Sequence, residues 1–257
     1  MSRILLLGSQ GDPAKDMVYN AIHPLFKIHS VFLEKPVSRL ELLRRRIRRL
    51  GWMRVLGQVG FEMLVVRPLR FLSRDRIAEI KKIHSLDATP IPGDRTQIFP
   101  TVNDASCIER IAALQPDLVL VKGTRILSES LLSAIRAPVV NMHVGITPLY
   151  RGVHGAYWAL AQNDPEHAGT TIHYVDKGID TGRIIAQRKV QFGRGDNFVT
   201  YPLLQIAAGI ELLKEYIPRL LAGETIPQPP VPGGRSRLWS HPTLWFYLRK
   251  RIFGGVK

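Results

Sequence analysis

The chain has 257 residues, of which 45% are hydrophobic, and this composition suits one α/β domain with an appendage. Lys and Arg together number 36 against 21 Asp and Glu, and the net charge of +15 favours an anionic partner such as a membrane surface, nucleic acid or phosphorylated substrate. The single cysteine, Cys107, excludes an internal disulfide and a cysteine-based zinc site, and no apolar run reaches the roughly 18 residues of a transmembrane helix.

Strands and helices alternate along most of the chain. The predicted strands cover 3–9, 28–34, 117–123 and 138–143, and the predicted helices between them cover 16–26 and 128–135. This alternation predicts a doubly wound, mostly parallel α/β sheet of the Rossmann-like kind. Sites in such sheets lie beyond the carboxyl ends of the strands, where the run 138–143 brings two polar side chains.

A basic helical insertion interrupts the alternation at about 36–83. Ser38 and Glu41 have the spacing of a helix N-terminal capping box, and Pro68 is expected to break the helical run. Leucine and isoleucine side chains between them form one stripe, and arginines crowd the other faces. Two interpretations stay open: a solvated helix that packs its stripe on the sheet, or a helix that lies on an anionic membrane.

A second basic segment closes the chain. Residues 226–234 are rich in proline and predict an extended linker, and 235–253 mix tryptophan and other aromatics with Arg and Lys. We therefore expect a catalytic domain over 1–225, followed by a linker and a basic aromatic tail over 226–257. The expected location is cytoplasmic, with peripheral contact at the inner face of the membrane as an open alternative; no nucleic-acid-binding module is evident.

Three polar side chains on separate segments suggest acyl-transfer chemistry. Asn141 and His143 are two residues apart in a predicted strand, so they point the same way, and Asp180 follows the alternating strand 171–175 in a glycine-flanked loop. An amide can donate to a developing oxyanion, a histidine can move a proton, and a carboxylate can orient the histidine and raise its pKa. His173, inside the strand, is expected to be structural.

Two stretches resemble a known family. "NMHVGITPLYRGVHGAYWAL" (141–160) and "AGTTIHYVDKGIDTGRIIAQRKV" (168–190) are similar to the catalytic domain of the folate-dependent formyltransferases, which include glycinamide ribonucleotide, methionyl-tRNA and sugar N-formyltransferases. The family pattern of Asn-x-His, a Tyr-Arg-Gly turn, Gly-x-Thr-x-His and Asp-x-Gly is present in order. The resemblance implies a Rossmann-like enzyme of one-carbon transfer that uses 10-formyltetrahydrofolate as co-substrate, without a metal.

The resemblance also implies roles for individual residues. Asn141 and His143 would stabilise the tetrahedral intermediate, and Asp180 would pair with His143 and organise proton transfer. The expected folate-binding residues are Arg125, Ile126, Leu127, Val175, Asp176 and Gly178, and the expected substrate-binding residues are Tyr150, Arg151 and His154. For Arg151 a turn-stabilising role is an equal alternative.

Departures from the family pattern bear on the acceptor. The first loop, "GSQGDPAKDM", carries Asp12 and Pro13 where the glycinamide ribonucleotide enzymes bind phosphate, and the stretch after 205 is shorter than the barrel domain of the methionyl-tRNA enzymes. An amino sugar, nucleotide- or lipid-linked, is therefore the expected acceptor. A formyltetrahydrofolate deformylase and a non-enzymatic peripheral membrane protein on the same fold are the alternatives.

Overall fold

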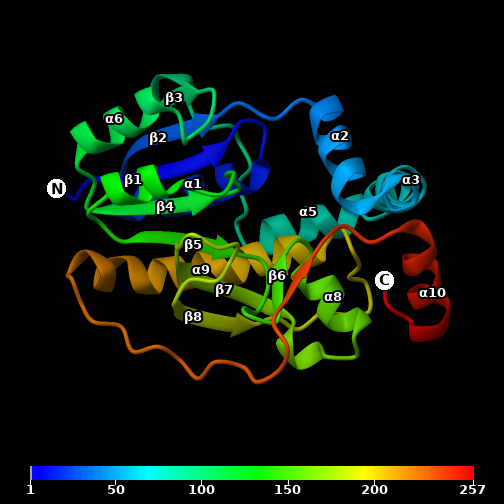
Figure 1. Cartoon of the computed structure of the whole chain (residues 1–257). Coiled ribbons are helices and arrows are strands. Elements are labelled where there is room, and N and C mark those ends of the chain that lie inside the picture. The colour runs from blue at the N-terminus through cyan, green and yellow to red at the C-terminus, as the bar shows by residue number, and fades with distance from the viewer. Residues whose placement is uncertain (1) are drawn as a thin grey trace.

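The computed structural model describes residues 2–257, and its centre is a seven-stranded sheet in the order β3-β2-β1-β4-β5-β7-β8 (Figure 1). The strands are β1 (Ile4–Ser9), β2 (Ile28–Glu34), β3 (Thr96–Phe99), β4 (Leu118–Lys122), β5 (Val139–His143), β7 (Gly169–Tyr174) and β8 (Ile184–Lys189). The first five run parallel, whereas β7 and β8 are antiparallel to their neighbours. The prediction of a doubly wound, mostly parallel sheet is confirmed.

Helices cover both faces of the sheet because its central strands are buried on both sides. One face packs against α1 (Pro13–Phe26), α5 (Arg74–Ile83) and α9 (Tyr201–Leu221), and the other packs against α6 (Ala105–Leu114) and α7 (Glu129–Ala134). Alternate residues of β1 divide between the faces: Ile4 and Leu6 join the first core, and Leu5 and Leu7 join the second. Ser128 caps α7, as predicted, by accepting a hydrogen bond from the Leu131 N–H.

The insertion is helical, as predicted, and consists of α2 (Arg39–Leu50), α3 (Trp52–Phe61), the π-helical turn η1 (Glu62–Val66), α4 (Arg67–Leu72) and α5. Ser38 caps α2 by accepting a hydrogen bond from the Glu41 N–H. The expected break at Pro68 is wrong: the wider π turn precedes it, and the chain passes directly into α4. A stripe of α2 packed on the sheet is also ruled out, since no residue of α2 is buried.

The tail returns to the main body after a stretch without regular structure over 222–236. Strand β9 (Arg237–Trp239) pairs with β6 (Tyr150–Gly152), and α10 (Leu244–Gly254) lies beside α3 at one end of the molecule (Figure 1). The indole of Trp239 stacks on that of Trp158 in α8 (Gly155–Ala161), with ring centroids 4.4 Å apart. These contacts form a third, aromatic core that joins the tail, α8 and the helices after α2. The 3₁₀ turns η2 (Gly93–Arg95) and η3 (Pro165–His167) complete the fold.

Candidate active site

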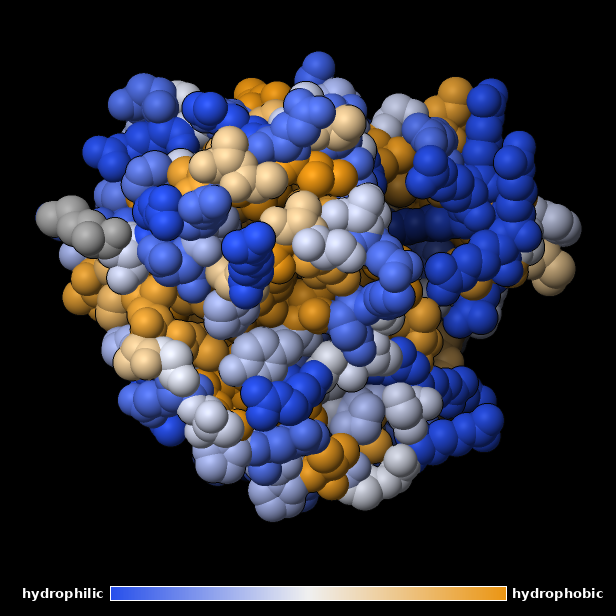
Figure 2. Space-filling view, turned by 60° about the vertical axis from the view of Figure 1, so that its left-hand side comes forward, coloured by the Kyte–Doolittle hydropathy of each residue, from blue (hydrophilic) through white to orange (hydrophobic). Residues whose placement is uncertain are grey.

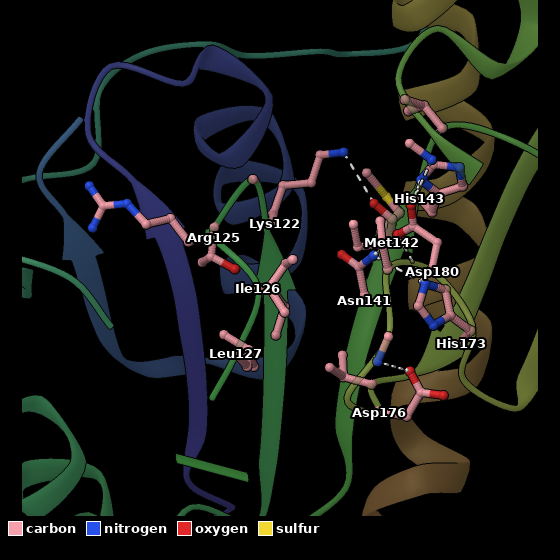
Figure 3. A pocket seen from close by; sticks show the side chains of 18 of the residues that line it. Lys122, Arg125, Ile126, Leu127, Asn141, Met142, His143, His173, Asp176 and Asp180 are labelled. Carbon is pink, nitrogen blue, oxygen red and sulfur yellow. Dashed lines mark hydrogen bonds and ion pairs between the residues drawn. The ribbon is translucent and has the colours of Figure 1, made fainter. Parts of the chain in front are cut away.

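A cavity of about 370 Å³ opens beyond the carboxyl ends of β4 and β5, where doubly wound sheets place their sites. Its walls come from the segments 121–127, 141–144, 152–153 and 173–180. Asn141, His143 and Asp180 lie together on one side, and the loop after β4 faces them (Figure 3). All three predicted catalytic residues and all six predicted folate-binding residues line this one cavity.

The register of two strands places Asn141 beside His173, which are cross-strand partners in the β5–β7 pair. The His173 Nδ1 lies 2.8 Å from the Tyr174 carbonyl and donates to it, so Nε2 is free to accept from the Asn141 amide at 3.1 Å. The second amide hydrogen is directed to the Asp180 Oδ1 at 3.2 Å. His173 also lines the cavity, and it fixes the amide of Asn141.

This arrangement corrects the orientation expected for Asn141. Both amide hydrogens are committed to His173 and Asp180, and a flip would turn the amide oxygen toward the carboxylate, which is unfavourable. The side-chain oxygen of Asn141 therefore faces the cavity, on the side of Ile126 and Leu127 (Figure 3). Asn141 offers the cavity an acceptor, not the oxyanion donor that the pattern suggested.

The His143 side chain is buried, and each of its two ring nitrogens lies next to an oxygen atom of the protein. Its Nε2 lies 2.8 Å from the Tyr150 carbonyl and donates to it, and its Nδ1 lies 3.4 Å from the Asp180 Oδ2. Burial lowers the pKa of His143, and this effect outweighs the opposing influence of Asp180. Asp180 does act to raise the pKa of His143, as expected, but burial has the larger effect, so the ring is neutral and presents Nδ1 as a base.

Asp180 carries the negative charge of the site. It adopts a left-handed backbone conformation (φ 52°), which is uncommon outside glycine and directs its carboxylate inward. The Gly152 N–H donates to its Oδ2 at 2.9 Å. Burial alone would raise the pKa of Asp180, but the Gly152 N–H, which donates to Oδ2, stabilises the carboxylate, and the pKa is lowered.

Hydrogen bonds on the side away from the cavity fix the loop after β4, and the backbone of this loop lines the cavity. Glu34, buried at the end of β2, accepts from the Arg125 N–H at 2.7 Å, and the Asn103 side-chain amide donates to the Ile126 carbonyl at 2.9 Å. The Arg125 guanidinium turns away and donates to the Pro100 and Lys35 carbonyls (Figure 3). Only the backbone of Arg125 is therefore placed to bind a ligand.

The three predicted substrate-binding side chains do not line the cavity. The Tyr150 hydroxyl donates to Asp164 at 2.7 Å, and His154 shares a hydrogen bond with His241 of the tail at 3.0 Å. Arg151 donates to the Ile179 carbonyl at 3.1 Å and so supports the loop that carries Asp180. For Arg151 the turn-stabilising alternative fits this geometry.

Sequence reasoning missed Lys122, which ends β4 and lines the cavity. Its side chain is buried, its Nζ donates to the Met142 carbonyl at 3.2 Å, and burial lowers its pKa despite the carboxylates of Asp12 and Asp180. Asp12 follows β1 and packs against Gly123, where a Cβ would collide with its carboxylate. The available signal was a lysine at the end of the otherwise apolar run "DLVLVKG", because an unpaired charge is rare in a buried strand.

Within residues 2–257 no three His, Cys, Asp or Glu side chains are grouped so that they could hold a metal ion. No helix in the described range is both long and apolar enough to cross a membrane.

Residues 95–201 match the protein family described as formyl transferase, and this range contains every residue that lines the cavity. A methionyl-tRNA formyltransferase of Levilactobacillus brevis is 32% identical over 144 residues, which are 56% of this chain and 45% of that protein. One of Anaeromyxobacter dehalogenans is 35% identical over 127 residues, or 49% and 40% of the two chains. The chain thus spans less than half the length of these relatives.

Solved structures extend the likeness to most of the chain. A phosphoribosylglycinamide formyltransferase from Streptococcus pneumoniae has a TM-score of 0.54 at 21% identity, covering 86% of this chain and 99% of that one. A sugar N-formyltransferase from a Shewanella species has a TM-score of 0.55 at 16% identity, covering 91% and 76%. At these identities the likeness establishes the fold.

Proposed function

Because residues 95–201 match the formyl transferase family, we propose that the protein is an N-formyltransferase that moves a formyl group from 10-formyltetrahydrofolate to a primary amine. The observation that carries the proposal is the placement of Asn141, His143 and Asp180 on one wall of a cavity within the matched range. The opposite wall, with apolar side chains and the backbone of residues 125–127, suits a flat heterocycle that needs both stacking surface and hydrogen bonds.

His143 takes the proton that the amine must lose. Its Nδ1 is the unprotonated nitrogen of a neutral ring, and the imidazolium that forms donates through Nε2 to the Tyr150 carbonyl and faces the Asp180 carboxylate through Nδ1. The low pKa of Asp180 keeps that carboxylate charged throughout. The Asn141 oxygen accepts a hydrogen from the same amine and thereby orients its lone pair toward the formyl carbon.

Lys122 stabilises the charge that develops on the formyl oxygen. Its Nζ donates one hydrogen bond to the Met142 carbonyl. Whether the Lys122 side chain is neutral or protonated, at least one further N–H remains to donate to a ligand. A donor in a site shielded from water contributes most where charge appears during the reaction. As the new C–N bond forms, the bond from carbon to the folate nitrogen breaks, and the proton held by His143 is available to that leaving nitrogen.

The acceptor is an amino sugar in this proposal. Asp12 stands beside Gly123 at the cavity edge, where a carboxylate would repel the phosphate of a small phosphorylated amine. The same carboxylate and Asp180 attract an ammonium group before it loses its proton. Solved sugar N-formyltransferases share the fold, and the sugar assignment is the part that an acceptor screen must decide.

The test measures tetrahydrofolate release from 10-formyltetrahydrofolate in the presence of nucleotide-linked and lipid-linked amino sugars. His143→Ala is expected to lower kcat by about 10²–10⁴-fold, since general-base catalysis is worth that much. His167→Ala is the matched control, because His167 pairs with Asp164 outside the cavity and its loss should leave turnover unchanged.

Full activity of the His143 variant would overturn the mechanism. Formate release without consumption of any amine would show that water is the acceptor, as in a deformylase. Absence of turnover with every amine, together with absence of folate binding, would reject the enzyme assignment.

A further inference from the structure

An exposed apolar stripe runs along α3 and η1. Trp52, Leu56, Val59 and Met63 recur at intervals of four, three and four residues, so they share one helical face. Trp52 is 65% exposed and Leu56 is 60% exposed. Tryptophan and long aliphatic side chains that are this exposed on one helical face indicate a binding surface for another molecule or for a membrane.

A second stripe lies on the neighbouring helix α10. Trp245, Leu248, Ile252 and Phe253 are all exposed, with Ile252 at 70% and Phe253 at 84%. The two helices approach closely because Gly57 leaves room for the Trp245 ring, which would collide with any Cβ there. We call the eight residues of the two stripes the apolar platform.

Positive charge is concentrated next to the platform, on α2, which contacts α3, and on α10 itself. Residues 39–72 contain nine arginines and two glutamates, and α10 contains three Lys and Arg without an acid, so these segments carry ten of the fifteen net charges. Among the residues described, Arg45 is the one arginine of the nine that forms an ion pair, with Glu41. Figure 2 shows hydrophilic side chains around a hollow at the upper right of the molecule, with hydrophobic ones beside them.

From this combination we propose that the apolar platform docks the protein on a bilayer rich in anionic lipid. The apolar side chains enter the boundary between headgroups and acyl chains, and the surrounding arginines contact the lipid phosphates. Charge complementarity favours an anionic membrane over a second copy of the chain, because two copies in contact here would bring two positively charged surfaces together and repel each other. Tryptophan at positions 52 and 245 suits the interfacial depth.

Two segments that flank the platform helices, α2 and β9, reach the surroundings of the cavity. Leu42 of α2 lines a hollow together with Gly123, Thr124 and Arg125, which belong to the loop that also borders the cavity. On the other side, β9 leads into α10 and pairs with β6, whose Gly152 lines the cavity. Docking therefore brings the cavity near the lipid surface, and, if the proposed function holds, the acceptor amine belongs to a membrane-anchored sugar.

Vesicle co-sedimentation tests the docking. We expect the full chain to bind vesicles of phosphatidylglycerol and phosphatidylcholine at low salt, to bind phosphatidylcholine vesicles much more weakly, and to lose affinity as salt is raised. Changing Trp52, Leu56, Ile252 and Phe253 to Gln should weaken binding by about tenfold or more, because each removes buried apolar area from the docked state. The matched control is Leu25→Gln with Ile98→Gln, since these side chains are 59% and 49% exposed outside the platform.

Several outcomes would overturn the docking. The first is that the unaltered protein fails to bind anionic vesicles at low salt. The second is that the platform variant, with a native circular dichroism spectrum, binds vesicles as tightly as the unaltered protein. The third is that the unaltered protein forms a stable dimer, that the platform substitutions make it monomeric, and that neither protein binds vesicles. His143→Ala should bind vesicles like the unaltered protein. Docking and formyl transfer can therefore fail independently of each other.

Discussion

At the scale of single residues, the cavity places one charged carboxylate beside two buried groups, His143 and Lys122. Asp180 is held as a carboxylate, whereas burial lowers the pKa of both His143 and Lys122. Asn141 links the groups by donating to Asp180 while its oxygen faces the cavity. This arrangement agrees with the proposed roles of His143 as the base and of Asp180 as an electrostatic support.

Replacing Lys122 with methionine tests its contribution. Lys122→Met keeps the volume of the side chain but removes its hydrogen-bond donor, so kcat should fall by about 10²–10³-fold while KM for the folate changes little. Lys177→Met is the control, because Lys177 is exposed and pairs with Glu129 at the surface.

The melting temperature of the Lys122 variant should not fall, because burying an amine is costly and methionine fills the same space. Unaltered kcat would remove Lys122 from the mechanism. A collapse of stability would instead assign the lysine a structural role.

At the scale of elements, two short strands connect distant parts of the chain. β6 and β9 are each three residues long, and their pairing brings His241 against His154 at the start of α8. Burial, together with the charge of Arg46 and, for His154, the neighbouring His241, lowers the pKa of His154 to about 3 and that of His241 to about 4. Both rings are neutral in the folded protein at physiological pH.

Acid should therefore destabilise the fold through this contact. In the unfolded chain a histidine titrates near 6.5, so between pH 6.5 and 4 the unfolded state binds more protons and the free energy of unfolding falls as pH falls. The loss is up to about 2 kcal/mol per histidine between pH 7 and pH 5. His241→Gln should make the melting temperature less dependent on pH in this window.

His29→Gln provides the reference, because His29 is exposed. An identical pH dependence for the two variants would contradict the assignment.

The elements also show what the sequence can and cannot predict. The central strands and Ser128 at the α7 N-terminus were predictable because local patterns, apolar runs and a capping side chain, determine them. The pairing of β6 with β9 was not, since it joins residues about 90 positions apart and neither strand is long enough to show a period. The apolar stripe of α2 was predicted but its exposure was left open, because an amphipathic pattern does not say what covers its apolar face.

The same limit applies to the cavity. The motifs located Asn141, His143 and Asp180, but the direction of the Asn141 amide depends on His173 across the sheet. The displacement of Tyr150 and His154 from the cavity depends on Asp164 and on the tail. Such contacts between segments are set by packing and leave no local signal.

At the scale of the whole molecule, charge is distributed unevenly. Helices α2 to α4 and α10 together hold ten of the fifteen net charges, six of the arginines lie on α2 beside the platform, and repulsion among these arginines opposes the folded arrangement. Raising sodium chloride from about 20 mM to about 300 mM should therefore stabilise the protein, by about 1 kcal/mol or roughly 2–4 °C in melting temperature.

Changing Arg44, Arg46, Arg48 and Arg49 of α2 to Gln should reduce this gain, whereas Arg136→Gln, on another part of the surface, should not. Thermal unfolding at the two salt concentrations measures both effects. If salt raises the melting temperature equally in the two variants, the arginines of α2 are not the source of the repulsion.

The pairing of β9 with β6 has a practical consequence for handling the protein. The same short strand that receives the tail, β6, ends at Gly152, whose N–H holds Asp180. The two chain ends lie on opposite sides of the molecule, and the C-terminal one is next to α10 (Figure 1). An affinity handle or fluorescent label therefore belongs at the N-terminus, since a bulky group at the other end would disturb α10, which is connected through β9 and β6 to the carboxylate of Asp180.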